Sequence, residues 1–191
     1  LHRFLGHLDL QRAMQRALRR SGLPVSYSQG FNPHLLLSFA SPLSVGIQGE
    51  REVMEVPLQS PVPEAAFLSQ LNATLPFGLK AKAARQVEDD TPPAMARLHA
   101  AMYTLRPETG FRALADAVPG FLALPNIPFL KKTKSGERME DLRPLVYNLI
   151  AREGALQAVL ALRESGSARP DQLLASLSQA AGIAPPRCLI T

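Results

Sequence analysis

The segment Leu8-Asp-Leu-Gln-Arg-Ala-Met-Gln-Arg-Ala-Leu-Arg-Arg-Ser21 decides how the first half of the chain is interpreted. Leu10, Met14, Ala17 and Leu18 recur at helical spacing and give the segment one apolar face. A glycine and a proline follow within the next three residues and are typical of a helix terminus. The sequence therefore predicts an amphipathic helix over residues 8–21.

Around this helix, the first half of the chain reads as an alternation of strands and helices. Strands are predicted at residues 3–5, 35–40, 53–58 and 79–87, and a second helix is predicted at residues 63–75. The resulting order of strand, helix, strand, strand, helix, strand is that of a ferredoxin-like βαββαβ unit.

The second half of the chain repeats this order, although its sequence does not visibly repeat the first. Residues 88–96 are acidic and then contain a proline pair, which is typical of a linker. Beyond them, helices are predicted at residues 109–118 and 170–180, and strands at residues 98–105, 127–133, 139–142, 145–151, 156–162 and 187–191. We therefore predict an α+β protein of two tandem ferredoxin-like units, residues 1–87 and 97–191, whose antiparallel sheets carry helices on one face.

Composition excludes several classes of protein. The chain has 191 residues, of which 46% are hydrophobic, and its 21 Lys and Arg against 16 Asp and Glu give a net charge of +5. This apolar content excludes disorder along the whole chain, and the single cysteine excludes a disulfide framework or an iron–sulfur cluster within it. No apolar run approaches the ~18 residues of a membrane span. We expect a cytoplasmic protein that does not bind membranes.

Arginines follow one side of the predicted first helix. Arg12, Arg16, Arg19 and Arg20 fall at positions i, i+4, i+7 and i+8, which is a single stripe opposite the apolar face. Together with Arg3 they give residues 1–48 a strong excess of positive charge, because Asp9 is the only acidic residue there. A patch of one sign attracts an anion more strongly than the net charge suggests. A solvated face kept for solubility is the alternative interpretation.

The segment after the helix, Tyr27-Ser-Gln-Gly-Phe-Asn-Pro-His34, is predicted to be a loop. Aromatic side chains stack on unpaired bases, and a glycine lets a backbone approach a nucleic-acid strand closely. Packing of the two aromatic residues into the core is the alternative. The residues of this loop predicted to contact nucleic acid are Tyr27, Gln29, Gly30, Phe31, Asn32 and His34.

A second basic cluster is predicted at the tip of a hairpin, in the segment Lys131-Lys-Thr-Lys-Ser-Gly-Glu-Arg138. Four cations within eight residues suit contact with phosphates, although solvation of an exposed tip explains them equally. Arg143 extends the cluster, and Asp141 either forms a local ion pair with it or fixes the base of the hairpin. The cations predicted to bind nucleic acid here are Lys131, Lys132, Lys134, Arg138 and Arg143.

Two histidines are candidates for catalysis. His7 begins the arginine helix and His34 ends the 27–34 loop; if the rings met, they could act as general acid and base on a phosphodiester. The alternative is that His7 caps the helix and His34 bonds the loop backbone. The sequence has no phosphate-binding glycine-rich loop, no serine-nucleophile motif and no Cys-x-x-Cys pair, and no metal site is predicted.

Four stretches together resemble a known family: Arg3-Phe-Leu-Gly-His-Leu-Asp-Leu10, Arg16-Ala-Leu-Arg-Arg-Ser-Gly-Leu-Pro24, the 27–34 loop and Leu37-Ser-Phe-Ala40. They are similar to the radical-SAM-linked domain family, a module found at the C-terminus of bacterial radical SAM proteins or as a separate protein. The resemblance implies a radical SAM partner that would hold S-adenosylmethionine and an iron–sulfur cluster, with no cofactor in this chain. The tandem ferredoxin-like prediction also resembles, at the level of fold alone, the CRISPR repeat-processing endoribonucleases.

The leading hypothesis is a non-catalytic RNA-binding or substrate-presenting module associated with a radical SAM enzyme, with rRNA or tRNA as the RNA partner. The first alternative is a metal-independent endoribonuclease of the CRISPR repeat-processing type, with His7 or His34 as acid or base. The second is a protein-interaction module in which the arginine stripe meets an acidic partner.

Overall fold

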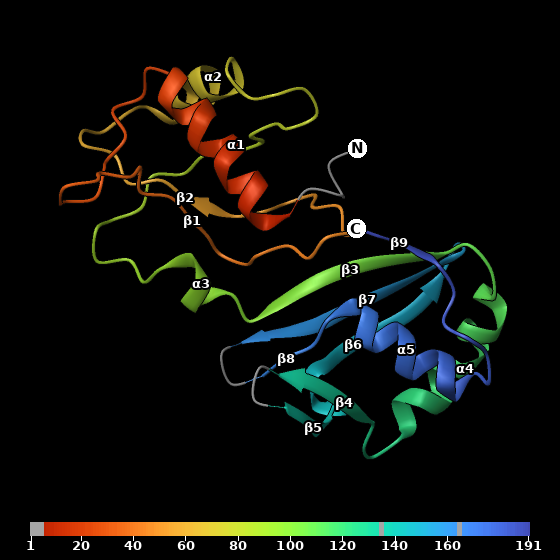
Figure 1. Ribbon diagram of the computed structural model, residues 1–191. Coiled ribbons are helices and arrows are strands. Elements are labelled where there is room, and N and C mark those ends of the chain that lie inside the picture. The colour runs from red at the N-terminus through yellow and green to blue at the C-terminus, as the bar shows by residue number, and fades with distance from the viewer. Residues whose placement is uncertain (1–5, 134–135, 164–165) are drawn as a thin grey trace. The chain divides into compact units, whose positions relative to one another are not determined.

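The computed structural model describes residues 6–133, 136–163 and 166–191, and shows an α+β protein with antiparallel sheets (Figure 1). The chain divides into two compact units, Leu1–Arg97 and Leu98–Thr191. The strand predicted at residues 3–5 lies outside the described residues. None of the described helices is long and apolar enough to cross a membrane.

The first unit is built on helix α1 (His7–Arg20). It begins after Gly6, and Asp9 in its first turn and Arg19 and Arg20 in its last turn complement the helix dipole. The apolar face of α1 is buried as predicted and packs into a core with residues from the extended segments and from helix α2 (Glu64–Asn72). That core contains Met14, Ala17, Leu18, Leu23, Val25, Leu35, Phe39 and Leu71.

The sheet of the first unit is much smaller than the sequence predicts. Strands β1 (Ser38–Phe39) and β2 (Met54–Glu55) form one antiparallel pair, and the neighbouring extended segments add isolated bridges between described residues, Val25–Leu58 and Tyr27–Leu35. Two tandem ferredoxin-like units are therefore not confirmed.

Residues 79–87, predicted as a strand, form none in the structure, and side chains of α2 bind backbone groups of Ala81 and Gln86 that a neighbouring strand could otherwise use. The Asn72 side-chain amide donates to the Ala81 carbonyl at 3.0 Å and accepts from the Ala81 amide at 2.9 Å. Farther along, the Gln86 amide donates to Glu64 Oε1 at 3.1 Å.

Where the sequence predicted a linker, the structure has a short helix, α3 (Ala94–Arg97). Glu55 on β2 accepts a 2.8 Å hydrogen bond from the Ala94 amide and lies 3.7 Å from the Arg97 guanidinium. These contacts attach α3 to the first unit. The predicted boundaries, 1–87 and 97–191 with a linker over 88–96, stay a prediction.

The second unit contains a larger antiparallel sheet with strands in the spatial order β6-β7-β3-β9. Helix α4 connects β3 to the hairpin that precedes β6, and helix α5 connects the β7–β8 hairpin to β9. The elements are β3 (Ala100–Pro107), α4 (Phe111–Ala123), β4 (Pro128–Thr133), β5 (Gly136–Asp141), the 3-10 turn η2 (Arg143–Leu145), β6 (Val146–Arg152), β7 (Ala155–Arg163), β8 (Gly166–Ser167), α5 (Pro170–Ala180) and β9 (Cys188–Ile190). Strands β4 and β5 form a separate hairpin.

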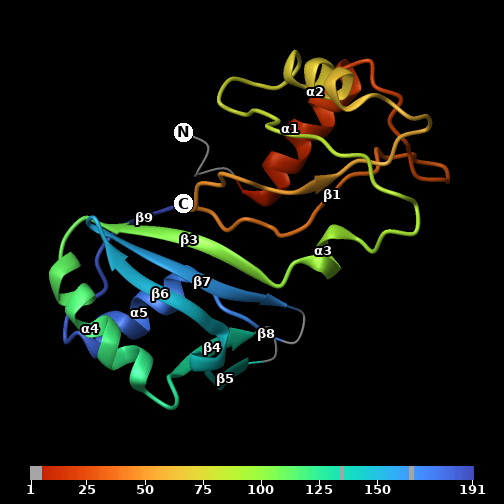
Figure 2. The ribbon, with the colours of Figure 1, turned by 180° about the vertical axis from the view of Figure 1, so that it is seen from behind.

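The two helices of the second unit cover one face of this sheet. Along β7, the residues Leu156, Ala158 and Leu160 are fully buried, and their period of two places them on the same side. The buried residues of α4 and α5 complete this core: Leu114, Val118, Phe121, Leu173, Leu174 and Leu177. Figure 2 shows the strands from the side opposite α5.

The prediction that a helix ends at residue 118 is wrong. Helix α4 continues through Pro119 to Ala123, although proline removes one backbone hydrogen bond. Val118 and Phe121, on either side of the proline, are buried in the core, and this packing stabilises the continued helix against its local preference to end.

Candidate nucleic-acid interface

Helix α1 exposes the predicted arginine stripe. Because the opposite face of the helix is buried, Arg12, Arg16, Arg19 and Arg20 all lie on the solvent side. Arg12 is 3.5 Å from Asp9, but both side chains are more than half exposed, so this ion pair is weak. In the part of the chain that the structure describes, the side chains of Arg16 and Arg19 form no hydrogen bond or ion pair.

Arg20 differs from the other three arginines because it connects α1 to α2. Its Nη2 donates to the Thr74 carbonyl at 2.7 Å, just beyond the end of α2. Thr74 in turn donates its hydroxyl to the Ala17 carbonyl at 2.9 Å. Arg20 thus has a structural contact, and the arginines available to an anion are Arg12, Arg16 and Arg19.

The 27–34 segment forms a loop closed at its base by Ser28 and His34. The Ser28 amide donates to the His34 carbonyl at 2.9 Å, and the His34 amide donates to Ser28 Oγ at 3.0 Å. The same hydroxyl lies 2.7 Å from His34 Nδ1. Ser28 is not among the site residues predicted from the sequence, although a serine close to the base of a predicted loop is a common backbone partner.

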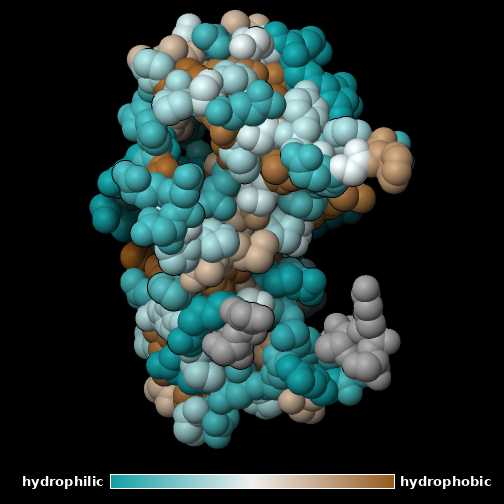
Figure 3. All heavy atoms as spheres, turned by 90° about the vertical axis from the view of Figure 1, so that its left-hand side faces the viewer, coloured by the Kyte–Doolittle hydropathy of each residue, from teal (hydrophilic) through white to brown (hydrophobic). Residues whose placement is uncertain are grey.

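The tip of this loop, residues 29–33, is exposed throughout. Phe31 is entirely exposed at 107%, and Tyr27 is exposed at 37%, so the alternative in which Phe31 packs into the core is wrong. Gly30 has φ +123°, a backbone conformation that side chains beyond glycine rarely adopt. The loop therefore presents an aromatic ring to solvent on a backbone turn that requires glycine. On the face seen in Figure 3, hydrophobic side chains lie in separate patches among hydrophilic ones.

The structure does not bring His7 and His34 together. The His7 ring packs edge-on against the Phe39 ring with centroids 5.4 Å apart, whereas the His34 ring contacts Ser28. Phe39 follows His34 by five residues, which in extended chain spans ~16 Å. No hydrogen bond or ring contact joins the two histidines among the described residues.

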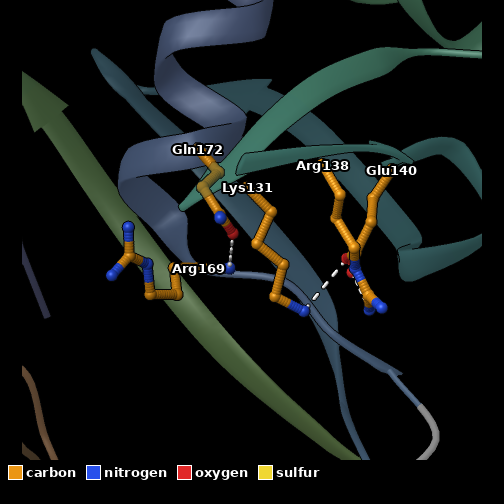
Figure 4. A network of polar contacts seen from close by, with 5 residues as sticks. All are labelled: Lys131, Arg138, Glu140, Arg169 and Gln172. Carbon is orange, nitrogen blue, oxygen red and sulfur yellow. Dashed lines mark hydrogen bonds and ion pairs between the residues drawn. The ribbon is translucent and has the colours of Figure 1, made fainter. Parts of the chain in front are cut away.

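Two cations of the β4–β5 hairpin, Lys131 and Arg138, share an acidic partner within the hairpin. Lys131 lies directly opposite Arg138, a like-charge pairing that is unfavourable by itself. Glu140 lies two residues after Arg138 on β5. It accepts hydrogen bonds from Lys131 Nζ at 3.0 Å and from Arg138 Nε at 2.6 Å (Figure 4). The hydrogen bond from Lys131, followed by that from Arg138, holds the pKa of Glu140 below its ordinary value, so the carboxylate stays charged.

The other predicted cations of this region are Lys132, Lys134 and Arg143, and each has a different position. Lys132 lies on β4 in register with Glu137, while Lys134, like Arg3 at the other end of the chain, lies outside the described residues. Arg143 is half-buried and has a structural role: its Nε donates to the Leu122 carbonyl at 3.1 Å, and its Nη1 donates to the Val146 carbonyl at 3.2 Å.

Asp141 fixes the base of the hairpin, one of the two roles predicted for it. Its Oδ1 accepts from the Ile127 amide at 2.7 Å and from the Arg143 amide at 2.9 Å. A shallow hollow of about 300 Å³ lies beside this network and is lined by charged and polar side chains. The described charged groups Lys131, Arg138, Glu140 and Asp141 therefore have partners within the hairpin or at its base.

Cys188 and the acidic and histidine side chains were the remaining candidates for nucleophilic or metal chemistry. Burial, followed by the charge of Glu108, raises the pKa of the Cys188 thiol to about 11, so this thiol is protonated at neutral pH. Among the described residues, no group of three or more His, Cys, Asp or Glu is placed to hold a metal ion. The arrangement suits binding through arginines and an exposed aromatic ring.

One comparison with known proteins gives a match. The model of a family described as an uncharacterized protein conserved in bacteria (DUF2344) matches residues 2–170. No curated protein and no solved structure matches the chain.

Proposed function

We propose that this chain, which belongs to the DUF2344 family of uncharacterized proteins conserved in bacteria, is a non-catalytic RNA-binding module that presents its substrate to a radical SAM enzyme. The observation that carries the RNA-binding proposal is the exposed stripe of Arg12, Arg16 and Arg19 on α1. These guanidiniums project from a helix, and among the described residues one weak contact with Asp9 competes with a phosphate for them.

The 27–34 loop supports RNA as the ligand. A fully exposed phenylalanine costs solvation free energy in the unbound protein, and stacking on an unpaired base recovers it. Single-stranded loops and ends of structured RNA offer such bases, whereas the bases of a duplex are already stacked. Phosphate contact by the stripe and base contact by Phe31 together suit tRNA or rRNA.

The association with a radical SAM enzyme is supported by the sequence resemblance of the segments around His7, the arginine helix and the 27–34 loop. That partner would supply S-adenosylmethionine and the cluster, since this chain has one cysteine. We also propose that the second unit is ferredoxin-like, because its main strands and helices follow the βαββαβ order, with the β4–β5 hairpin inserted before β6.

RNA binding is tested by gel shift with labelled total tRNA and rRNA fragments over a series of salt concentrations. In the variant with Arg12, Arg16 and Arg19 replaced by Ala, we expect weaker binding and a slope of log K against log salt that is shallower by about 2–3. The matched control replaces three other exposed arginines, Arg51, Arg85 and Arg112, and is expected to keep a slope closer to wild type.

The outcomes separate the candidate functions. Equal slopes in the stripe variant and the control contradict the stripe as the binding surface. Cleavage of the RNA on the same gels, lost in His34→Ala or His7→Ala, would replace the proposal with the endoribonuclease alternative. Absence of any binding at about 100 mM salt leaves the acidic protein partner. Co-elution of the chain with a radical SAM enzyme of the same organism, with and without RNA, tests the partner.

A further inference from the structure

The sheet of the second unit has one face that its helices leave open. Leu105, Leu156 and Ile190 are buried and lie in register across β3, β7 and β9, so they mark the face under the helices. Residues that alternate with them lie on the opposite side. We call this opposite side the open sheet face, defined by Met102, Thr104, Tyr147, Asn148, Ile150, Gln157 and Val159.

Large apolar side chains are exposed on the open sheet face. Met102 is 73% exposed, Tyr147 46% and Ile150 42%. The strand register places Met102 beside Val159, and Gln157 beside Ile150, so these side chains adjoin across three strands. In Figure 2 the strands β3, β7 and β6 are seen from this side, with α5 behind them. The face is thus an exposed, partly apolar platform.

Tyr147 is the aromatic centre of this platform. It lies at an irregularity in the β6–β7 pairing, between Val146 and Asn148, which turns its side chain onto the open face. The Arg163 guanidinium lies over the Tyr147 ring, 5.6 Å from its centroid. This exposed cation–π contact favours one orientation of both planar groups and covers one face of the ring, so a base stacks on the uncovered side of the pair.

The charge of the sheet is entirely positive. The strands β3, β6, β7 and β9 contain three arginines, Arg106, Arg152 and Arg163, and no aspartate or glutamate. All three arginines are exposed, and among the described residues only Arg152 has a carboxylate partner, Glu153 in the adjoining turn at 3.0 Å. Face-to-face pairing of two copies would bring like charges together, which disfavours a second copy of this chain as the occupant. Apolar and aromatic surface with cations around it is complementary to bases and phosphates.

We propose that the open sheet face binds an unpaired segment of RNA, with a base stacked on Tyr147 and phosphates contacted by Arg163 at this end of β7 and by Arg106 and Arg152 at the other end of the strands. This inference rests on the proposed function and specifies the part of the RNA that the second unit takes. The stripe on α1 contacts backbone phosphates of structured RNA, whereas this face reads an exposed single strand.

The test is fluorescence anisotropy of the full chain with a labelled 12-nucleotide uridine oligomer and, in parallel, with a 12-base-pair RNA duplex. Tyr147→Ala is expected to weaken binding of the single strand by about 5- to 100-fold and to leave duplex binding within about twofold. Tyr147→Phe keeps the ring and is expected to bind like wild type. Because the chain has no tryptophan and three tyrosines, quenching of tyrosine emission by the oligomer, lost in Tyr147→Ala, gives a second readout.

Met102→Glu keeps the test decisive if Tyr147→Ala misfolds, because the exposed Met102 side chain tolerates replacement and the new carboxylate repels phosphate. Wild-type affinity for the single strand in both variants overturns the proposal. So does a concentration-dependent dimer that Met102→Glu abolishes, since a second copy then occupies the face.

If the single strand fails to bind wild type while tRNA binds through the stripe, this inference alone fails. If Tyr147→Ala weakens the single strand but the stripe variant binds every RNA normally, the stripe alone fails.

Discussion

The arginine stripe of α1 and the basic hairpin of β4 and β5 are alike in sequence and different in structure. Each places several cations within a short segment, and the spacing of each suits phosphate contact. On α1, Arg16 and Arg19 project from one face of a helix whose other face is buried, with no described partner. On the hairpin, Lys131 and Arg138 share one carboxylate, that of Glu140.

This difference shows that the density of cations in a sequence does not determine whether they are available to a ligand. In a helix, side chains at i, i+4 and i+7 share one face whatever the rest of the chain does. In a hairpin, the register decides which charges meet, and the β4–β5 register gives both cations the same acidic partner. The stripe therefore remains the stronger candidate for an RNA contact.

The largest effect on stability is expected for Arg143→Ala. Its guanidinium satisfies two backbone carbonyls, one at the end of α4 and one at the start of β6, so its removal should lower the free energy of unfolding by about 1–3 kcal/mol. Arg16→Ala, on the stripe, should change it by less than about 0.5 kcal/mol. Urea unfolding monitored by circular dichroism makes the comparison. Unchanged stability with reduced RNA affinity would show instead that Arg143 belongs to the binding surface.

A smaller effect, on RNA affinity, is expected for Glu140→Gln, which should make the cations of the hairpin as available to RNA as those of the stripe. Removing the carboxylate charge releases Lys131 and Arg138, and we expect RNA affinity at low salt to rise by about 2- to 5-fold, with a steeper salt dependence. Asp116→Asn on α4 is the control with the same change in charge. Equal gains in both variants would show that only the net charge matters and would remove the distinction between the hairpin and the rest of the surface.

The smallest effect is expected in the pH dependence of the free energy of unfolding. The pKa of Glu140 is lowered from its ordinary value of 4.5, first by the hydrogen bond from Lys131, so pairing stabilises the fold above that value and the contribution is lost as pH falls through the lowered pKa. The stability difference between wild type and Glu140→Gln should be constant from about pH 5 to 8 and should shrink below about pH 4. Urea unfolding at several pH values and at high salt measures it. A difference that grows on acidification would contradict the pairing.

The sequence by itself determined the elements whose pattern is local. Helix α1, with its buried apolar side and its exposed arginines, follows from a periodicity of 3.6 residues, and β7 follows from an alternating run. The 27–34 loop follows from its glycine and proline. These features depend on neighbours only a few residues away, so the local amino-acid sequence is enough to determine them.

The tertiary structure alone decided which of these groups have partners. Whether Lys131 is free depends on the β4–β5 register, which places Glu140 within reach of its ammonium group. Backbone groups in the segment 79–87, predicted as a strand, are bonded instead by Asn72 and Glu64 of a neighbouring helix. The role of Arg143 and the contact of Arg163 with Tyr147 likewise join residues from different elements. Such contacts arise from the pairing of segments distant in sequence, and no local pattern fixes which segments will pair.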